Sequence, residues 1–462
     1  MKNLKIRFTH IQKVILGSVL GVAMLLMLGP SAVGSQEADS RAFSLKQARD
    51  FAIQHNYDAQ KSQMDVTIAE KIRRQTIGAG LPQINSSISY QNNLELPTVL
   101  IPDFFGGNPD DFIEIQFGTQ HNASASLTVS QLVFNGSYFV GLATSRIFQQ
   151  LADQGYKRTQ LQVKDTVTST YYTILISQES EKIINSNLDN LEKTLYEIRE
   201  SYKEGFVEET DADNVQINVT SLKNTLQNLQ KGTKTAYDLL KFQMGLDLSE
   251  EIELTETLED VLTRSGIEEA MAATFNLNQS IDYQLTQTQE KMAEMNLKNE
   301  KTKYLPSLAA FYSLSFNAQR NRFNFLDFSN KWYRSQVLGV SVDIPLFKSG
   351  SQKAKVQQAS LALNQARNTT RQVAQGLLLQ DTQAQNALNA AFENYLNVKD
   401  NMGLSQKVYD VTLIKYQEGL ATSLELTQAN DRYLLSQSNY IQALLQLLNA
   451  KNSLDRIRNS YD

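Results

Sequence analysis

The sequence predicts a mixed, mainly α-helical fold built from long antiparallel coiled-coil hairpins and four amphipathic β-strands. Three observations predict it. More than a hundred residues after Phe347 contain no proline, which permits long helices, and seam residues recur there every 3.5 residues on average. The same seam occurs 214 positions earlier, so the chain is a two-fold internal repeat. Between the helical zones, apolar and polar residues alternate as in strands with one apolar face.

The first residues are typical of a signal peptide, which we expect to span residues 1–34. A basic start precedes an apolar run that ends at Leu28, and Ala32 and Gly34 occupy the −3 and −1 positions of a cleavage site before Ser35. An uncleaved inner-membrane anchor is the alternative, although the run is short for a spanning helix. The sequence therefore favours export.

Composition narrows the class of protein. The chain of 462 residues has no cysteine, so neither a disulfide framework nor a lipid-modified cysteine is available. Without the four basic residues of the signal peptide, the formal charge of −5 becomes −9, which argues against a nucleic-acid partner. The mean hydropathy of −0.35 is that of a soluble protein, but strands that alternate across a membrane escape this test.

Residues 35–80 are predicted to form N-terminal helices, with Ser44 as the first N-cap. In the second half, the segment 247–304 contains the corresponding helices, which we expect from Ile267 to Asn276 and from Ile281 to Tyr304. Both helical segments end at a Leu-Pro pair, and the residue before a proline is driven out of the α region. We therefore expect strands to begin at Pro82 and Pro306.

Two strand pairs are predicted, with their loops, in residues 81–135 and 305–347. Apolar residues alternate with polar ones in four segments, at Ile84, Ile88 and Tyr90, at Ala123, Ala125, Leu127 and Val129, at Tyr312, Leu314 and Phe316, and at Leu338, Val340, Val342 and Ile344. The first loop, from about Gln91 to His121, is acidic. The second, from Asn317 to Arg334, is mostly basic.

Residues 136–246 and 348–462 are each predicted to form a helical hairpin. The outgoing helices run for about 66 residues, or roughly 100 Å at 1.5 Å per residue. The positions expected to shape the hairpins are the start of each long helix and each turn, namely Gly136, Gly350, Tyr202, Gly205, Tyr416 and Gly419. Four strands are too few to close a barrel, so a membrane barrel needs strands from several chains.

The order and duplication of these features, from about Ser44 to Ile457, resemble the TolC-type outer-membrane efflux proteins, also called outer-membrane factors. The resemblance rests on the two Leu-Pro pairs, on Phe-Asn-Gly and Phe-Lys-Ser-Gly after the second strand of each half, and on Tyr-x-x-Gly at each turn. It implies a homotrimer in the outer membrane of a Gram-negative-type cell. A twelve-stranded β-barrel would continue into an α-barrel that crosses the periplasm, surrounded in the membrane by outer-membrane lipid.

The resemblance also implies a passive exit duct for small molecules or proteins, in a tripartite efflux or type I secretion system. A periplasmic adaptor and an inner-membrane pump would be its partners. The alternatives are a periplasmic adaptor with a coiled-coil hairpin and a structural coiled coil without a pore. Adaptors usually carry one hairpin flanked by β-rich domains, whereas two hairpins alternate here with two strand pairs.

A periplasmic gate is implied at the helix starts that come after the turns. Relatives carry acidic rings six and nine residues after the turn glycine, which correspond here to Glu425 and Gln428. Asp211 lies six after Gly205, and the resemblance implies that it is on the outer hairpin and affects hairpin pairing more than selectivity. Ala421 replaces the basic residue that latches neighbouring helices in some members. No cofactor, metal site or catalytic site is predicted, because His55 and His121 have no companion at metal-ligand spacing and no phosphate loop is present.

Overall fold

The structure is a computed structural model, and it describes residues 41–102, 112–325, 327 and 329–461. Contacts divide the chain into two compact units, Met1–Arg41 and Ala42–Asp462. The predicted signal peptide lies outside the described residues, and so does part of the acidic first loop. The helices and the main sheet all belong to the second unit.

The helices of this unit alternate between very long and short. In chain order they are α2 (Leu45–His55), α3 (Tyr57–Ala79), α4 (Gly136–Lys203), α5 (Glu209–Met244), α6 (Leu258–Arg264), α7 (Ile267–Ala272), the 3₁₀ turn η1 (Leu277–Gln279), α8 (Ile281–Thr302), α9 (Ser351–Gln417) and α10 (Ser423–Arg458). Within the described residues, none is both long and apolar enough to cross a membrane.

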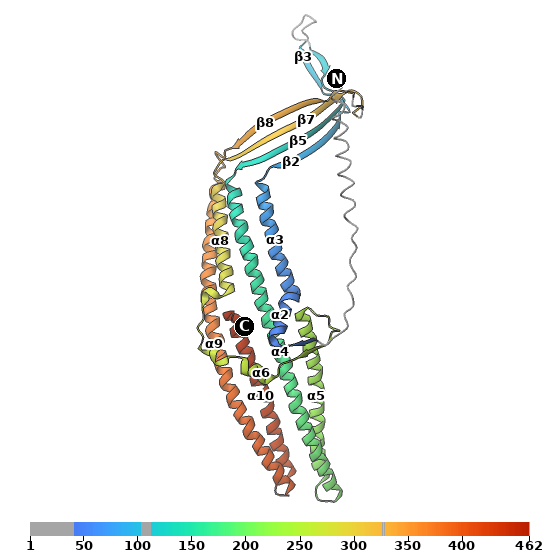
Figure 1. Cartoon of the computed structure of the whole chain (residues 1–462), viewed down its shortest axis with the longest axis vertical. Helices are drawn as coiled ribbons and strands as arrows, with labels where there is room; N and C mark the ends of the chain where they lie inside the picture. The colour runs from blue at the N-terminus through green and yellow to red at the C-terminus, as the bar shows by residue number, and fades with distance from the viewer. Residues whose placement is uncertain (1–40, 103–111, 326, 328, 462) are drawn as a thin grey trace. The chain divides into compact units, whose positions relative to one another are not determined.

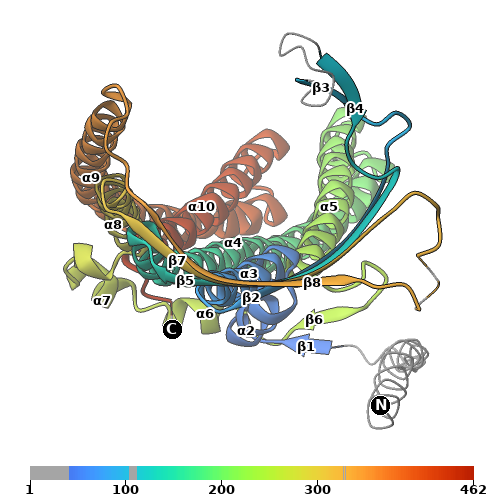
Figure 2. The same ribbon diagram turned by 90° about the horizontal axis from the view of Figure 1, so that it is seen from above.

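Four long strands form the main sheet, in the order β2-β5-β7-β8 with every neighbouring pair antiparallel. They are β2 (Gln83–Asn92), β5 (His121–Phe134), β7 (Ser307–Arg320) and β8 (Tyr333–Asp343). Figure 1 shows this sheet at one end of the long helices and the turns α4–α5 and α9–α10 at the other. Seen from above, the sheet is an arc with α5 and α10 on its concave side (Figure 2).

The register confirms the predicted apolar face of the sheet. Ile88 lies opposite Ala125, which lies opposite Phe316, and Tyr312 lies opposite Leu338. Because directly opposite residues share a face, the apolar residues of all four strands form one surface. It is open in the single chain, since Ile88 is 84% and Leu338 82% exposed.

The other face of the sheet carries a ladder of hydroxyl groups. Ser87 and Ser126 are hydrogen-bonded at 2.8 Å, and Ser89 and Ser124 at 2.7 Å. Cross-strand hydroxyl pairs of this kind add stability to the sheet.

Near the sheet the long helices pack side by side in the order α3, α4, α8, α9, and each helix contacts the next one. Beyond the ends of α3 and α8, α5 packs on α4 and α10 packs on α9 and α4. The largest core cluster lies at this junction, with Tyr171, Leu240, Met244 and Leu444 fully buried. Tyr171 donates its hydroxyl hydrogen to the carbonyl of Phe43 at 3.1 Å, which fixes the N-terminal strand β1 (Arg41–Phe43) against α4.

The structure corrects three of the sequence expectations. The first loop, expected to join the strands without a strand of its own, contains the hairpin of β3 (Thr98–Pro102) with β4 (Phe112–Gln116). The second loop is shorter than expected, because β7 continues to Arg320. The helix from Ile267, expected to reach Asn276, ends at Ala272 and is followed by η1. The sequence also gave no sign of the small two-stranded sheet of β1 and β6 (Ile252–Leu254).

Candidate functional site at the hairpin tips and the central groove

The two hairpin turns have the same backbone geometry. Gly205 and Gly419 have φ of 77° and 71°, in the left-handed region that glycine adopts freely. The amide of the residue after each glycine donates to the carbonyl five residues back, Phe206 to Ser201 at 2.9 Å and Leu420 to Lys415 at 2.7 Å. This Schellman arrangement ends α4 and α9 cleanly and lets the return helix start at once.

Glu425 lies one turn into α10 and folds back onto the helix start. Its carboxylate accepts hydrogen bonds from the Thr422 amide at 2.8 Å and the Thr422 hydroxyl at 3.1 Å, while the Glu425 amide donates to that hydroxyl. This is a capping box. The bonds from Thr422 lower the pKa of Glu425 below its ordinary value, so the exposed carboxylate is ionised at neutral pH.

Asp211 connects the two hairpins. The Ser423 hydroxyl, at the start of α10, donates to the Asp211 carboxylate at the start of α5, and the Glu208 amide donates to the same carboxylate at 3.3 Å. Gln428 is exposed one turn beyond Glu425 and is not drawn into this contact. The structure therefore separates the three predicted gate residues: Asp211 lies between the hairpins, whereas Glu425 and Gln428 lie on the open surface of α10.

The two turn tyrosines, Tyr202 and Tyr416, occupy equivalent positions of the repeat but differ in their contacts and exposure. Tyr202 is 41% exposed, and its hydroxyl donates to Glu209 at 3.4 Å. Tyr416 packs against the cluster of the other hairpin, around Leu191 and Val215. Its burial, with the nearby Asp211 charge, raises its pKa. The second hairpin is thus held against the first at its tip by Tyr416 and Ser423.

The remaining predicted positions lie where strands and helices meet. Pro82 and Pro306 directly precede β2 and β7. Gly136 is the first residue of α4, and Gly350 is the N-cap of α9. Close packing explains the glycine at position 136, because a Cβ there would lie 2.8 Å from Cβ of Thr302 in α8.

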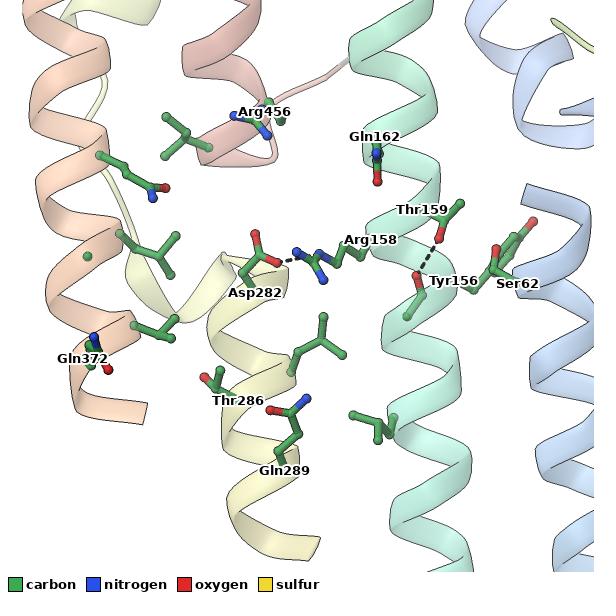
Figure 3. Close-up of a pocket in the computed structure, with 18 of the residues that line it drawn as sticks. Ser62, Tyr156, Arg158, Thr159, Gln162, Asp282, Thr286, Gln289, Gln372 and Arg456 are labelled. Carbon is green, nitrogen blue, oxygen red and sulfur yellow. Dashed lines mark hydrogen bonds and ion pairs between the residues drawn. The ribbon is translucent and has the colours of Figure 1, made fainter. Parts of the chain in front are cut away.

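A large groove lies beside α8 at the level where α10 ends. It has a volume of about 1380 Å³ and is lined by α3, α4, α8, α9 and the end of α10. Figure 3 shows Arg158 of α4 pointing across it to Asp282 of α8, with which it forms an ion pair at 2.8 Å. Glutamine and threonine side chains such as Gln162, Gln289 and Thr286 supply most of the other labelled polar groups.

The four-stranded sheet and the two helical hairpins allow a comparison with known proteins. The sequence profile described as "Outer membrane efflux protein" matches residues 49–246 and 276–460. The chain belongs to this family. The two matched segments fall in the two repeats, on either side of β6 and α6.

Individual relatives of this outer membrane efflux protein are distant in sequence. The chain is 20% identical over 339 residues to the outer membrane protein TolC of Vibrio cholerae, covering 72% of this chain and 77% of TolC. It superposes on the CmeC outer membrane channel of Campylobacter jejuni with a TM-score of 0.69 at 15% identity, covering 94% and 95% of the two chains. The open state of MtrE of Neisseria gonorrhoeae gives 0.69 at 15%, covering 93% and 94%. These solved channels share the fold.

Membership of the family confirms the predicted class of function. The protein is an efflux duct of the outer membrane, and the family is one of ducts and not of enzymes. The alternative of a periplasmic adaptor is not favoured, because the match covers both repeats, strands included.

Sequence reasoning missed the contacts that hold the end of α10. The Arg458 side chain is 9% exposed and pairs with Asp381 of α9 at 2.7 Å, while its other nitrogens donate to Gln385 and to the carbonyls of Ala270 and Ala273. The end of α10 is also joined to α4, because the Asn452 side chain donates to the Asp165 carboxylate at 2.7 Å. A cluster of basic residues in the last helical turn was the only signal, and it is the ordinary pattern of a helix C-terminus.

Proposed function

We propose that three copies of the chain assemble into a passive duct whose entrance is closed at the hairpin tips. The supporting observation is the apolar face of the four-stranded sheet, most of which no other described part of the chain covers. Lipid would cover that face, and strands from further copies would satisfy the free backbone groups of the edge strands β2 and β8.

In this duct each predicted segment would have a separate role. Residues 81–135 and 305–347 would form the membrane part, and the hairpins 136–246 and 348–462 the periplasmic wall. Residues 35–80 and 247–304 would brace the wall at its equator, where the helix ends meet. An adaptor and an inner-membrane pump would supply energy and cargo, since a conduit of helices and strands has no coupled reaction of its own.

The entrance would be selective for cations. Glu425 is exposed and ionised at neutral pH, so three copies near a common axis would attract cations and disfavour anions. Gln428 is neutral, so this predicts one layer of three charges and modest selectivity. Divalent and trivalent cations added from the periplasmic side would block the pore.

Single-channel recording on the purified trimer tests the gate with Glu425→Gln. We expect a smaller reversal potential in a salt gradient and weaker block by divalent cations, with the trimer equally stable because an exposed charge contributes little to folding. Glu418→Gln, an exposed acid in the turn itself, is the matched control. Unchanged selectivity and block in Glu425→Gln would remove this residue from the gate. Recovery of the wild type as a soluble monomer would overturn the duct.

A further inference from the structure

The apolar face of the sheet ends in arginines on the side away from the helices. Along β7, residues of even number share a face, so Arg320 comes after Leu314 and Phe316 on the apolar face. In β8, Arg334 lies directly opposite Phe316 and is on the same face. Both guanidinium groups therefore mark the outer limit of the apolar surface.

Aromatic rings cover the same limit. Tyr90 of β2 packs edge-on against Phe323 and Phe325 with ring centroids 5.4 and 5.8 Å apart, and its hydroxyl is hydrogen-bonded to Nδ1 of His121 at 2.9 Å. Phe325 is 9% exposed, whereas Phe323 is 61% exposed. The chain after β7 thus folds back onto the apolar face. We call Tyr90, His121, Arg320, Phe323, Phe325 and Arg334 the outer belt.

The belt is positively charged and only partly neutralised. The Arg320 guanidinium lies 5.0 Å from the Phe325 ring centroid, its Nη1 donates to the carbonyl and the side chain of Asn324, and its Nη2 is buried, so Arg320 is held in place and contributes its charge. Arg334 is exposed, and no ion pair joins it to a residue that the structure describes. The nearby acid Asp327 accepts hydrogen bonds from Ser329 and Asn330, and the Arg320 charge helps to lower its pKa, so Asp327 offsets part of the Arg320 charge and leaves Arg334 as the uncompensated arginine.

We propose that the outer belt binds the phosphate groups of lipid headgroups at the membrane surface. The inference rests on the proposed function, which places the apolar face in lipid. Aromatic rings of this kind settle at the boundary between acyl chains and headgroups. The exposed Arg334 offers paired N–H donors that match phosphate oxygens, Arg320 adds a positive charge beside it, and the headgroup layer begins where the apolar face ends. The occupant is therefore a phosphorylated lipid, with its acyl chains along β7 and β8.

Native mass spectrometry of the full-length protein in detergent tests the proposal. The probes are bisphosphorylated lipid A and the same lipid with its phosphates removed. We expect the wild type to retain the bisphosphorylated form about tenfold more strongly, a difference of about 1.4 kcal/mol. Arg334→Gln should lose most of this preference, and Arg320→Gln with Arg334→Gln should lose all of it. Lys348→Gln removes one exposed charge beyond the opposite end of β8 and should leave the preference intact.

Each other result has a clear meaning. Equal retention of the two lipids by the wild type, or a preference that survives the double substitution, would overturn the proposal. Displacement of the lipid by millimolar inorganic phosphate would show a free-anion site and would also overturn it. If Arg334→Gln weakens the trimer without changing lipid retention, the arginine contacts a neighbouring copy instead. Mass spectrometry reports lipid binding separately for monomer and trimer. If no trimer is seen, that result contradicts the proposed duct, while the lipid preference of the monomer still tests the outer belt.

Discussion

The two return helices, α5 and α10, are equal in length but are joined to the rest of the molecule in different ways. Each has 36 residues and packs back along its long partner helix. The end of α5 is held by apolar side chains and close backbone contact, with Leu240 and Met244 fully buried and Gly245 against the carbonyl of His55. The end of α10 also has fully buried leucines, Leu447 and Leu454, but it adds a nearly buried ion pair between Arg458 and Asp381. The repeat therefore preserves helix geometry while the chemistry of the joint has diverged.

The difference has a physical consequence. An apolar joint is non-directional and is affected little by pH or salt, whereas a buried ion pair is strong only while both partners are present. We expect α10 to be the helix whose attachment can be disrupted by single charge changes. Substitutions at the two joints test this contrast, and the largest effect is expected at Arg458.

Substitution Arg458→Ala should release the end of α10. It removes the partner of the Asp381 carboxylate, which is 15% exposed, and leaves that charge nearly buried. Losing one partner of such a pair costs about 3–5 kcal/mol. Amide hydrogen exchange at residues 450–458 should become faster by about 10²-fold or more, with α5 unaffected. Arg456→Ala, whose side chain is 54% exposed, is the control and should cost no more than about 1 kcal/mol. Equal effects of the two substitutions would refute the anchoring role of Arg458.

Substitution Gly245→Ala tests the apolar joint. Gly245 has φ of 73°, and an added Cβ would lie 2.2 Å from the backbone oxygen of His55, which has no room to yield. We expect a loss of about 1–3 kcal/mol, seen as faster exchange at the end of α5. Gly232→Ala in the middle of α5 meets nothing within 4 Å and should stabilise the helix by about 0.5–1 kcal/mol. If Gly245→Ala left exchange at the end of α5 unchanged, the close contact between Gly245 and His55 would contribute nothing to the attachment of this helix.

Acid should affect the tip and the equatorial end of α10 in opposite directions. The pKa of Glu425 is lowered, so the stability from its capping box is present above the unfolded pKa and is lost as the pH falls through the folded value, below 4.5. Burial raises the pKa of Asp165 and of Asp455, so folding is favoured more as the pH falls through their raised values towards 3.8.

The measurement is hydrogen exchange across this range, corrected for intrinsic rates. Protection should fall at residues 422–428 and should rise at residues 452–458, while the end of α5, held by apolar contacts, should change little. Asp165→Asn should remove part of the rise at the equator. Loss of protection at both ends of α10 together would contradict the assignment.

The predictability of these features depends on the range of the interactions that produce them. The hairpins and their turns were predicted because heptad spacing and the glycines Gly205 and Gly419 act locally. The strands β2, β5, β7 and β8 were predicted because alternation is also local. The hairpin β3–β4 was missed because Val99 and Ile101 form too short an alternation within a proline-containing loop.

The contacts at the end of α10 could not be predicted from the sequence, for a different reason. Arg458 and Asp381 are 77 positions apart, and each looks like an ordinary solvated charge on a helix surface. The same holds for Asp165 and Asn452, which are 287 apart. At the tip, the spacing from each turn glycine indicated Glu425 and Asp211, and the resemblance assigned Asp211 to hairpin pairing, but its partner Ser423 is visible only in the fold.

The smallest expected effect concerns that contact between the tips, which joins α5 to α10 directly. The Ser423 hydroxyl donates to the Asp211 carboxylate, and a charge-assisted hydrogen bond at a partly exposed site contributes about 0.5–1.5 kcal/mol. Because this bond crosses from one hairpin to the other, Ser423→Ala should ease the separation of the tips and raise the frequency of channel opening about two- to tenfold. Asp211→Ala should act in the same direction but also weakens the start of α5, where the carboxylate accepts from the Glu208 amide.

Single-channel recording of both single variants and the double variant isolates the contribution of this hydrogen bond, since the two effects should be clearly less than additive. Ser201→Ala is the control, because the Ser201 hydroxyl donates to the Glu197 carbonyl within its own helix. Additive effects of Ser423→Ala and Asp211→Ala would show that the bond does not hold the hairpins together, and Tyr416 would then be left as the main contact of the second tip with the first.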